Sequence, residues 1–271
     1  MYIKPKFGII VFLDALGART TDIRVSKDYL HKVSPLRTRI IEMKSAFGEA
    51  DMELDEFNRV KSELLTFRFF GDSVLIAYEL PLNRAPERCM QYVFFITSMF
   101  ICSALELGIL FRGAISIGDY LESGSVFLGP AITDAANWYD QSDMIGALVT
   151  PAALNYLKAT LGIDMESSQE EIEAPLQGLL LYDVPISRSA RNENRTLRTY
   201  AADWPDMISM IRNDQTDDLS WFYNKIKSLP VPIGAESKYA NSEAFIKLSQ
   251  ARHRPGPKKG AASKASANVS K

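Results

Sequence analysis

The chain has 271 residues, of which 46% are hydrophobic and 24% charged, and its formal net charge at neutral pH is -2. A nearly neutral chain has no overall field that draws it to nucleic acid or to an anionic membrane, so neither is expected as its main partner. The two cysteines form no disulfide framework, and the two histidines are too few for a histidine triad or a multi-histidine metal site. A reduced, cytoplasmic setting without a signal peptide is therefore expected.

The first half of the chain predicts alternating strands and helices. Residues 7–13 form an apolar, β-branched run that is typical of a strand covered on both faces, and it ends at Asp14. Residues 27–61 have a helical period and are interpreted as a helix plus a connector. Residues 64–70 and 73–78 predict two strands joined by the turn dipeptide Gly71-Asp72.

A long helix is then expected over residues 84–107. Its uninterrupted apolar part is shorter than the roughly 20 residues that cross a membrane. We therefore expect a buried helix and no membrane span.

Further along, residues 109–117 and 125–128 predict a strand pair around Gly118-Asp119-Tyr120. Pro130 suits the first turn of a helix that should run to about Asp140. A strand, a helix and a strand follow at residues 147–150, 151–160 and 178–182. The order is β-α-β-β-α-β with extra elements, which favours an α+β, ferredoxin-like core with its helices on one face.

The C-terminal part divides into two segments. Residues 204–248 are predicted to be helical, and the sequence assigns them no role. Residues 251–271 contain few large apolar residues and are expected to be a disordered tail, so the predicted domains are 1–250 and 251–271. Basic residues in the tail could contact nucleic acid or an anionic surface. The more ordinary interpretation is a solvated tail without a function. The basic residues are Arg252, Arg254, Lys258, Lys259, Lys264 and Lys271.

Two aspartates are the first candidates for chemistry. Asp14 ends the first strand and Asp72 lies in the hairpin turn, and these strands neighbour each other in a ferredoxin-like core. Two carboxylates that face one spot can hold Mg²⁺, which prefers oxygen ligands and also contacts substrate phosphates. The alternative is that Asp72 is an ordinary turn residue.

Four motifs together resemble the class III adenylyl and guanylyl cyclase domain, and among its branches most of all the bacterial pyrimidine cyclases of Pycsar antiphage systems. They are FLDALG at 12–17, FGDSV at 70–74, FRGAISIG at 111–118 and FLGPAI at 127–132. The resemblance covers about residues 7–150. It implies a nucleotidyl cyclase that makes a cyclic nucleotide for a downstream effector in antiphage defence.

The resemblance also implies roles for single residues. Asp14, Asp72 and the carbonyl oxygen of Ala15 match the ligands of two Mg²⁺ or Mn²⁺ ions per site. Gly17 and Ala18 fall where backbone amides cradle phosphate, and Arg112 falls on a phosphate-binding arginine; without the family, Arg112 is equally well a salt-bridge residue. The ribose 3′-hydroxyl would attack the α-phosphorus and expel pyrophosphate.

Base choice and the catalytic helix depart from the adenylyl cyclase pattern. The positions that read adenine in adenine-specific relatives hold Arg68 and Val126 here. An arginine without an acidic partner favours UTP over CTP and purine nucleotides, because uracil offers two carbonyls and no exocyclic amine. The alternatives are that the Ser125 hydroxyl accepts from an exocyclic amine, or that Arg68 lies on the outer face of its strand without a specific role. Thr133 and Asn137 stand where the family has an asparagine and a transition-state arginine. The alternative is therefore a degenerate nucleotide-binding module.

The family's domains form head-to-tail homodimers with active sites between the chains. In such a dimer, one protomer supplies Asp14, Asp72 and Arg112, and the other supplies Arg68, Thr133 and Asn137. A nucleic-acid binder that works through the tail is the third and weakest hypothesis, because the folded part lacks basic or aromatic patterning.

Overall fold

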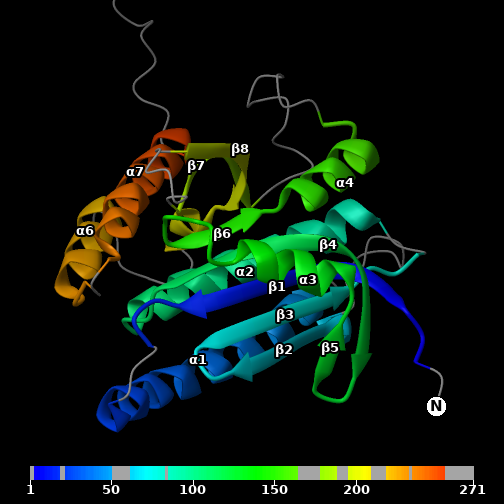
Figure 1. The fold of residues 1–271 in the computed structure, drawn as a ribbon, viewed down its shortest axis with the longest axis horizontal. Helices are drawn as coiled ribbons and strands as arrows, with labels where there is room; N and C mark the ends of the chain where they lie inside the picture. The colour runs from blue at the N-terminus through cyan, green and yellow to red at the C-terminus, as the bar shows by residue number, and fades with distance from the viewer. Residues whose placement is uncertain are drawn as a thin grey trace, which may run out of the picture.

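The structure is a computed structural model, and it describes residues 3–18, 22–50, 62–82, 85–163, 178–187, 195–208, 218–231 and 234–253. The first half of the chain forms β1 (Lys6–Ala15), α1 (Ile23–Ala50), β2 (Leu65–Phe70), β3 (Ser73–Glu79), α2 (Pro86–Glu106) and β4 (Phe111–Ser123), with a short 3-10 segment, η2 (Ser62–Leu64), before β2. These strands lie in the order β2-β3-β1-β4, and each neighbouring pair is antiparallel (Figure 1). The predicted α+β, ferredoxin-like core is confirmed.

The second half extends this sheet and adds helices. It comprises β5 (Val126–Leu128), α3 (Pro130–Trp138), β6 (Gly146–Val149), α4 (Pro151–Leu161), β7 (Leu179–Ile186), β8 (Arg195–Ala202), η3 (Trp204–Met207), α6 (Asp218–Ser228) and α7 (Glu236–His253). β6 pairs in parallel with β4, and β8 and β7 continue the sheet beyond it. β5 pairs with β4 as a hairpin off the main path of the sheet.

Two predictions on the strands need correction. The turn expected at residues 118–120 is absent, because β4 continues to Ser123 and Tyr120 pairs with Lys6 of β1; the hairpin turns at Gly124 and Ser125 instead. β8 was not predicted at all. The end of the expected connector, residues 51–61, and most of the expected tail, residues 254–271, lie outside the described residues. The first three residues of that tail, 251–253, are instead the end of a helix, and Arg252 donates to the carbonyl of Leu179 over 3.0 Å.

The two faces of the sheet bury different clusters. Ile9, Val11 and Leu13 of β1 point into the large core, which also contains buried residues of α1 and α2. Ile10 belongs to a smaller cluster on the opposite face, together with Ala131 and Ala135 of α3. Because side chains alternate along a strand, Asp14 lies on the same face as Ile10 and α3.

α2 is a core helix. It begins with Pro86 in its first turn, where the missing N–H has no helical partner, and 15 of its residues are buried. It is long and apolar enough to cross a membrane, but 83% of its apolar window is buried inside the protein, as was predicted for a buried helix. Cys89 and Cys102 lie within it as buried thiols, and neither forms a disulfide bond with a described residue.

The C-terminal elements pack into the same large core. Trp204 is fully buried, its ring centroid lies 5.4 Å from that of Phe222 in α6 and 6.5 Å from that of Phe245 in α7, and its indole N–H donates to the carbonyl of Ile145 over 3.2 Å. The helices α6 and α7 thus lie at one end of the sheet, beside β6 and β7 (Figure 1).

Candidate active site

Asp14 lies on the central strand of the ferredoxin-like core and is only 4% exposed. Its neighbours in register are Ser73 of β3 and Arg112 of β4. The Ser73 hydroxyl donates to Asp14 Oδ1 over 3.4 Å, and Arg112 Nη2 lies 3.7 Å from Asp14 Oδ2. Burying a carboxylate is unfavourable unless its charge is compensated, and these two groups provide compensation.

Asp72 lies in the Gly71-Asp72 turn between β2 and β3, as predicted. Its carbonyl oxygen accepts a hydrogen bond from the backbone N–H of Ala15 over 2.9 Å. The turn is therefore fastened to the residue that follows Asp14. The structure places the main chains of the two predicted aspartates side by side at one edge of the sheet.

Tyr29, on the second turn of α1, was not identified from the sequence. Burial, and then the charges of Asp72 and Asp14, raise the pKa of its phenol well above the ordinary value. The hydroxyl oxygen is buried and has no hydrogen-bond partner among the described residues, so its donor is not used within the protein.

Gly17 and Ala18 follow β1 and line a pocket of about 300 Å³. Gly17 has a φ of +75°, which favours glycine, and it turns the chain out of the strand. The opposite walls come from the first turns of α1, including Tyr29 and Lys32, and from Leu229, Pro230 and Val231 before α7. The predicted phosphate loop therefore borders a pocket that Ala15, the residue after Asp14, also lines.

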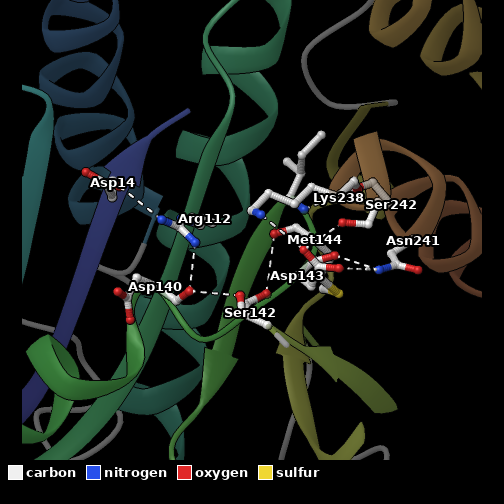
Figure 2. A network of polar contacts seen from close by, with 12 residues as sticks. Asp14, Arg112, Asp140, Ser142, Asp143, Met144, Lys238, Asn241 and Ser242 are labelled. Atoms are coloured by element: carbon white, nitrogen blue, oxygen red, sulfur yellow. Dashed lines mark hydrogen bonds and ion pairs between the residues drawn. The ribbon is translucent and has the colours of Figure 1, made fainter. Parts of the chain in front are cut away.

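Arg112 lies between Asp14 and the chain after α3 (Figure 2). Its Nη1 donates to the carbonyl of Asp140 over 2.7 Å, and the side chain is 18% exposed. The sequence predicted a phosphate-binding arginine here. The structure brings its guanidinium to Asp14 and fixes it through a backbone carbonyl that no sequence motif indicated.

Arg68 of β2 lies on the α3 face, in register with Leu75 of β3 and, through it, with Phe12 of β1. Its guanidinium carbon lies 5.9 Å from the ring centroid of Phe127, and Nη2 donates to the carbonyl of Gly124 over 3.5 Å. The β4–β5 hairpin, which carries the predicted base-reading position Val126, therefore folds over towards Arg68. Val126 itself is 54% exposed.

The expectation that Arg68 has no acidic partner is wrong. Its Nη2 lies 3.8 Å from Oε1 of Glu122, while Oε2 of Glu122 is 2.9 Å from Nζ of Lys6. The carboxylate therefore interacts more closely with the lysine than with the arginine. Glu122 is distant from Arg68 in sequence and lies on the part of β4, after the expected turn at residues 118–120, that was not predicted to be a strand.

Thr133 and Asn137 lie one helical turn apart on α3, and both are exposed. Neither side chain forms a hydrogen bond or an ion pair with Asp14, Asp72 or Arg112 within the part of the chain that the structure describes. A single protomer thus brings the two aspartates, Arg112 and the phosphate loop together, and presents the α3 residues to solvent.

Asp134 fixes the buried side of α3. Its Oδ2 accepts hydrogen bonds from the Ser116 hydroxyl over 2.7 Å and from the Thr150 hydroxyl over 2.5 Å. Thr150 in turn caps the N-terminus of α4 by accepting from the N–H of Ala153. One carboxylate therefore joins α3, β4 and α4, and it sets the direction in which Thr133 and Asn137 point.

The residues at this edge suit a hard divalent cation. Among the described residues no group of three or more histidine, cysteine, aspartate or glutamate side chains forms a protein-only metal cage. Two carboxylates with a nearby backbone carbonyl at Ala15 are instead the kind of partial ligand set that Mg²⁺ completes with water and substrate phosphates. Tyr29, whose hydroxyl is buried and unpartnered among the described residues, lines the same pocket as Ala15.

Comparison with known proteins gives structural neighbours but no sequence relatives. No family model and no curated protein matches the chain. The chain is similar to the crystal structure of an adenylyl cyclase from P. aeruginosa, at 10% identity and a TM-score of 0.45, over 74% of this chain and 96% of that one.

Two further structures are similar over the same share of this chain. One is an adenylate/guanylate cyclase/hydrolase from Silicibacter pomeroyi, with 15% identity, a TM-score of 0.43 and 98% of that chain covered. The other is the catalytic core of a rhodopsin-guanylyl cyclase with converted specificity in complex with ATPalphaS, with 12% identity, a TM-score of 0.40 and 98% of that chain covered.

Proposed function

We propose that this protein is a nucleotidyl cyclase that converts a pyrimidine nucleoside triphosphate, with UTP favoured, to its 3′,5′-cyclic monophosphate and pyrophosphate. The observation that carries the proposal is the meeting of Asp14, Asp72 and Arg112 on one edge of a ferredoxin-like sheet, next to the pocket of the Gly17-Ala18 loop. The four motifs that resemble class III cyclases supply these same residues.

The chemistry follows from the charges of the site. The ribose 3′-oxygen forms a bond to the α-phosphorus, the bond from that phosphorus to the bridging oxygen of the β-phosphate breaks, pyrophosphate leaves, and the hydroxyl proton passes to solvent. Asp14, Asp72 and the carbonyl of Ala15 would hold two Mg²⁺ or Mn²⁺ ions, whose charge favours ionisation of the 3′-hydroxyl. The backbone at Gly17 and Ala18 cradles the outer phosphates, and Arg112 donates to the phosphate oxygens.

The preference for UTP rests on Arg68. A guanidinium donates hydrogen bonds and accepts none, so it matches the two carbonyls of uracil. CTP is the second candidate, because its exocyclic amine needs an acceptor and Glu122 lies 3.8 Å from the guanidinium. Glu122 is already paired with Lys6 at 2.9 Å, which leaves it a poorer acceptor for that amine.

A homodimer completes the site. Thr133, Asn137 and Val126 are exposed on the α3 face and its hairpin, and Phe70 and Leu128 expose apolar surface nearby, at 42% and 60%. We infer that a second copy covers this face in a head-to-tail arrangement and brings its Arg68, Thr133 and Asn137 to the aspartates of the first. The cyclic product then serves as a cytoplasmic signal to an effector in antiphage defence.

The second candidate is a nucleotide-binding module without turnover. It is favoured by one observation, the uncharged Asn137 on an exposed helix face where cyclases place an arginine. In the enzyme, transition-state charge must then be stabilised by Arg112 and the bound cations.

The test is incubation of the purified protein with ATP, GTP, CTP and UTP separately, with Mg²⁺ or Mn²⁺, and identification of products by chromatography and mass. Asp72→Ala should abolish the product. Asp183→Ala is the matched control, because Asp183 lies on β7 with 57% of its side chain exposed and should leave activity intact. Cyclic CMP instead of cyclic UMP would overturn the UTP preference, and nucleotide binding without any product would favour the binding module.

The shared site is tested by mixing two inactive variants. Asp72→Ala and Arg68→Ala should each lose activity alone, and their mixture should regain about a quarter of the wild-type activity, because half of the dimers are mixed and each mixed dimer has one intact site. No recovery in a mixture that forms mixed dimers would contradict sites built from both chains.

A further inference from the structure

The position of Arg112 depends on a backbone carbonyl outside any helix or strand. Arg112 Nη1 is held by the carbonyl of Asp140 at 2.7 Å, and Nη2 lies 3.7 Å from the carboxylate of Asp14. Its Nε is buried and has no hydrogen-bond partner among the described residues. The guanidinium is therefore divided between Asp140 and Asp14, and a shift of the Asp140 carbonyl would change its contact with Asp14.

The segment that carries this carbonyl, residues 139–145, connects α3 to β6, and β7 supports it from one side. The Ser187 hydroxyl donates to the same Asp140 carbonyl over 3.2 Å. The N–H of Asp143 donates to the carbonyl of Pro185 over 2.8 Å, and Ser142 forms a bridge with Ile186. These contacts leave the side chain of Asp143 and the N–H of Ile145 for the C-terminal helix.

α7 binds the segment with four polar side chains, as Figure 2 shows for three of them. Asn241 donates to the carbonyl of Asp143 over 2.8 Å and to its Oδ2 over 3.2 Å. Lys238 lies 3.1 Å from Asp143 Oδ1, and Ser237 donates to the same oxygen over 3.0 Å. Ser242 accepts from the N–H of Ile145 over 2.8 Å.

These contacts are more than α7 needs for attachment. Phe245 and Ile246 are already fully buried in the large core. The ion pair between Lys238 and Asp143 has side chains only 12% and 16% exposed, so both charges are largely removed from water. Such a pair fixes geometry more than it adds stability, which suggests that its role is to hold the 139–145 segment in one place.

We propose that α7 positions Arg112 through residues 139–145, so that the C-terminal extension is a working part of the candidate active site. The inference rests on the proposed function for its catalytic consequence. With α7 engaged, the Asp140 carbonyl draws the guanidinium away from Asp14. Without the polar contacts of α7, the carbonyl moves and Arg112 closes on Asp14, which removes the arginine from phosphate and neutralises a metal-binding carboxylate. Asn241, Lys238 and Asp143 are positioning residues.

The test compares the variant Asn241→Ala with two control variants. Asn241→Gln keeps an amide donor, and Lys247→Ala removes a lysine from the same helix on an exposed position that does not contact residues 139–145. Isotope-labelled arginine gives an Nε–H signal for Arg112 in an NMR spectrum, assigned by its loss in Arg112→Lys. Asn241→Ala should shift this signal, Asn241→Gln should restore it in part, and Lys247→Ala should leave it unchanged.

Turnover provides the second measurement. In Asn241→Ala, kcat should fall about ten-fold, as is usual for residues that orient catalytic groups, while KM changes little. An unchanged Arg112 signal in folded Asn241→Ala would overturn the proposal. If the wild-type protein turns over no nucleotide, the proposed function fails and the NMR comparison still decides the coupling. If Asn241→Ala does not fold, the exposed Ser237→Ala, which removes one hydrogen bond to Asp143, takes its place.

Discussion

Replacing Asp134 by alanine tests how α3 is held on the sheet. The Asp134 carboxylate accepts hydrogen bonds from two buried hydroxyls, those of Ser116 and Thr150, which are 1% and 0% exposed. Alanine leaves both without an acceptor. Each unsatisfied buried group costs about 1–3 kcal/mol, so for two such groups the free energy of unfolding should fall by about 2–6 kcal/mol. That is a large part of the stability of an ordinary domain.

Two further variants separate the hydrogen bonds from other effects. Asp134→Asn keeps one acceptor oxygen but loses the charge, and it should cost about 1 kcal/mol. Asp119→Ala, at an exposed position on β4, should remain within about 0.5 kcal/mol of the wild type. Urea unfolding followed by circular dichroism measures all three.

The double variant Asp134→Ala/Ser116→Ala gives the sharpest comparison. It removes one orphaned hydroxyl along with its acceptor, so it should be more stable than the sum of the two single changes predicts. If Asp134→Ala unfolds within about 0.5 kcal/mol of the wild type, the two hydroxyls find water instead, and the role of Asp134 in orienting α3 is refuted.

Three other outcomes are expected. Gly113→Ala should lower the free energy of unfolding by about 3 kcal/mol or more, because a Cβ there would lie 2.2 Å from the carbonyl oxygen of Phe12. A urea midpoint equal to that of the wild type would contradict this packing. Tyr29→Phe should leave Tm unchanged or slightly higher, since it removes a buried hydroxyl without a described partner, and a Tm lower by several degrees would reveal a hidden hydrogen bond. Burial raises the pKa of Tyr200 from 10.0 to about 12. The contribution of its protonated phenol to the free energy of unfolding is therefore complete below pH 10 and is lost as pH rises through about 12. In an alkaline titration of stability, this loss should be smaller in Tyr200→Phe.

Local patterns were sufficient to predict the core of the fold. The apolar run of β1 needs burial on both faces, and the Gly71-Asp72 turn separates two strands of the right length, so the meeting of Asp14 and Asp72 followed from topology alone. These features depend on neighbours in sequence or on one strand pairing. The sequence predicted these elements correctly because no pairing with a distant part of the chain opposed the local pattern.

The errors arose where tertiary pairing outweighs the local signal. Gly118-Asp119 has the composition of a turn, yet the pairing of Tyr120 with Lys6 keeps β4 extended. The longer strand carries Glu122 to Arg68, and this contact changed the argument on base choice. The unpartnered hydroxyl of Tyr29 is likewise a property of packing, and no sequence spacing indicates it.

The burial of Trp204 limits how this protein can be divided. Its ring packs against both α6 and α7, and its indole N–H donates a hydrogen bond to the carbonyl of Ile145, just before β6. A shortened version that stops before this tryptophan would lose a large aromatic side chain from the shared interior and expose the surface that it covers. Efforts to prepare a shorter version of this protein should therefore keep every residue through His253, where α7 ends.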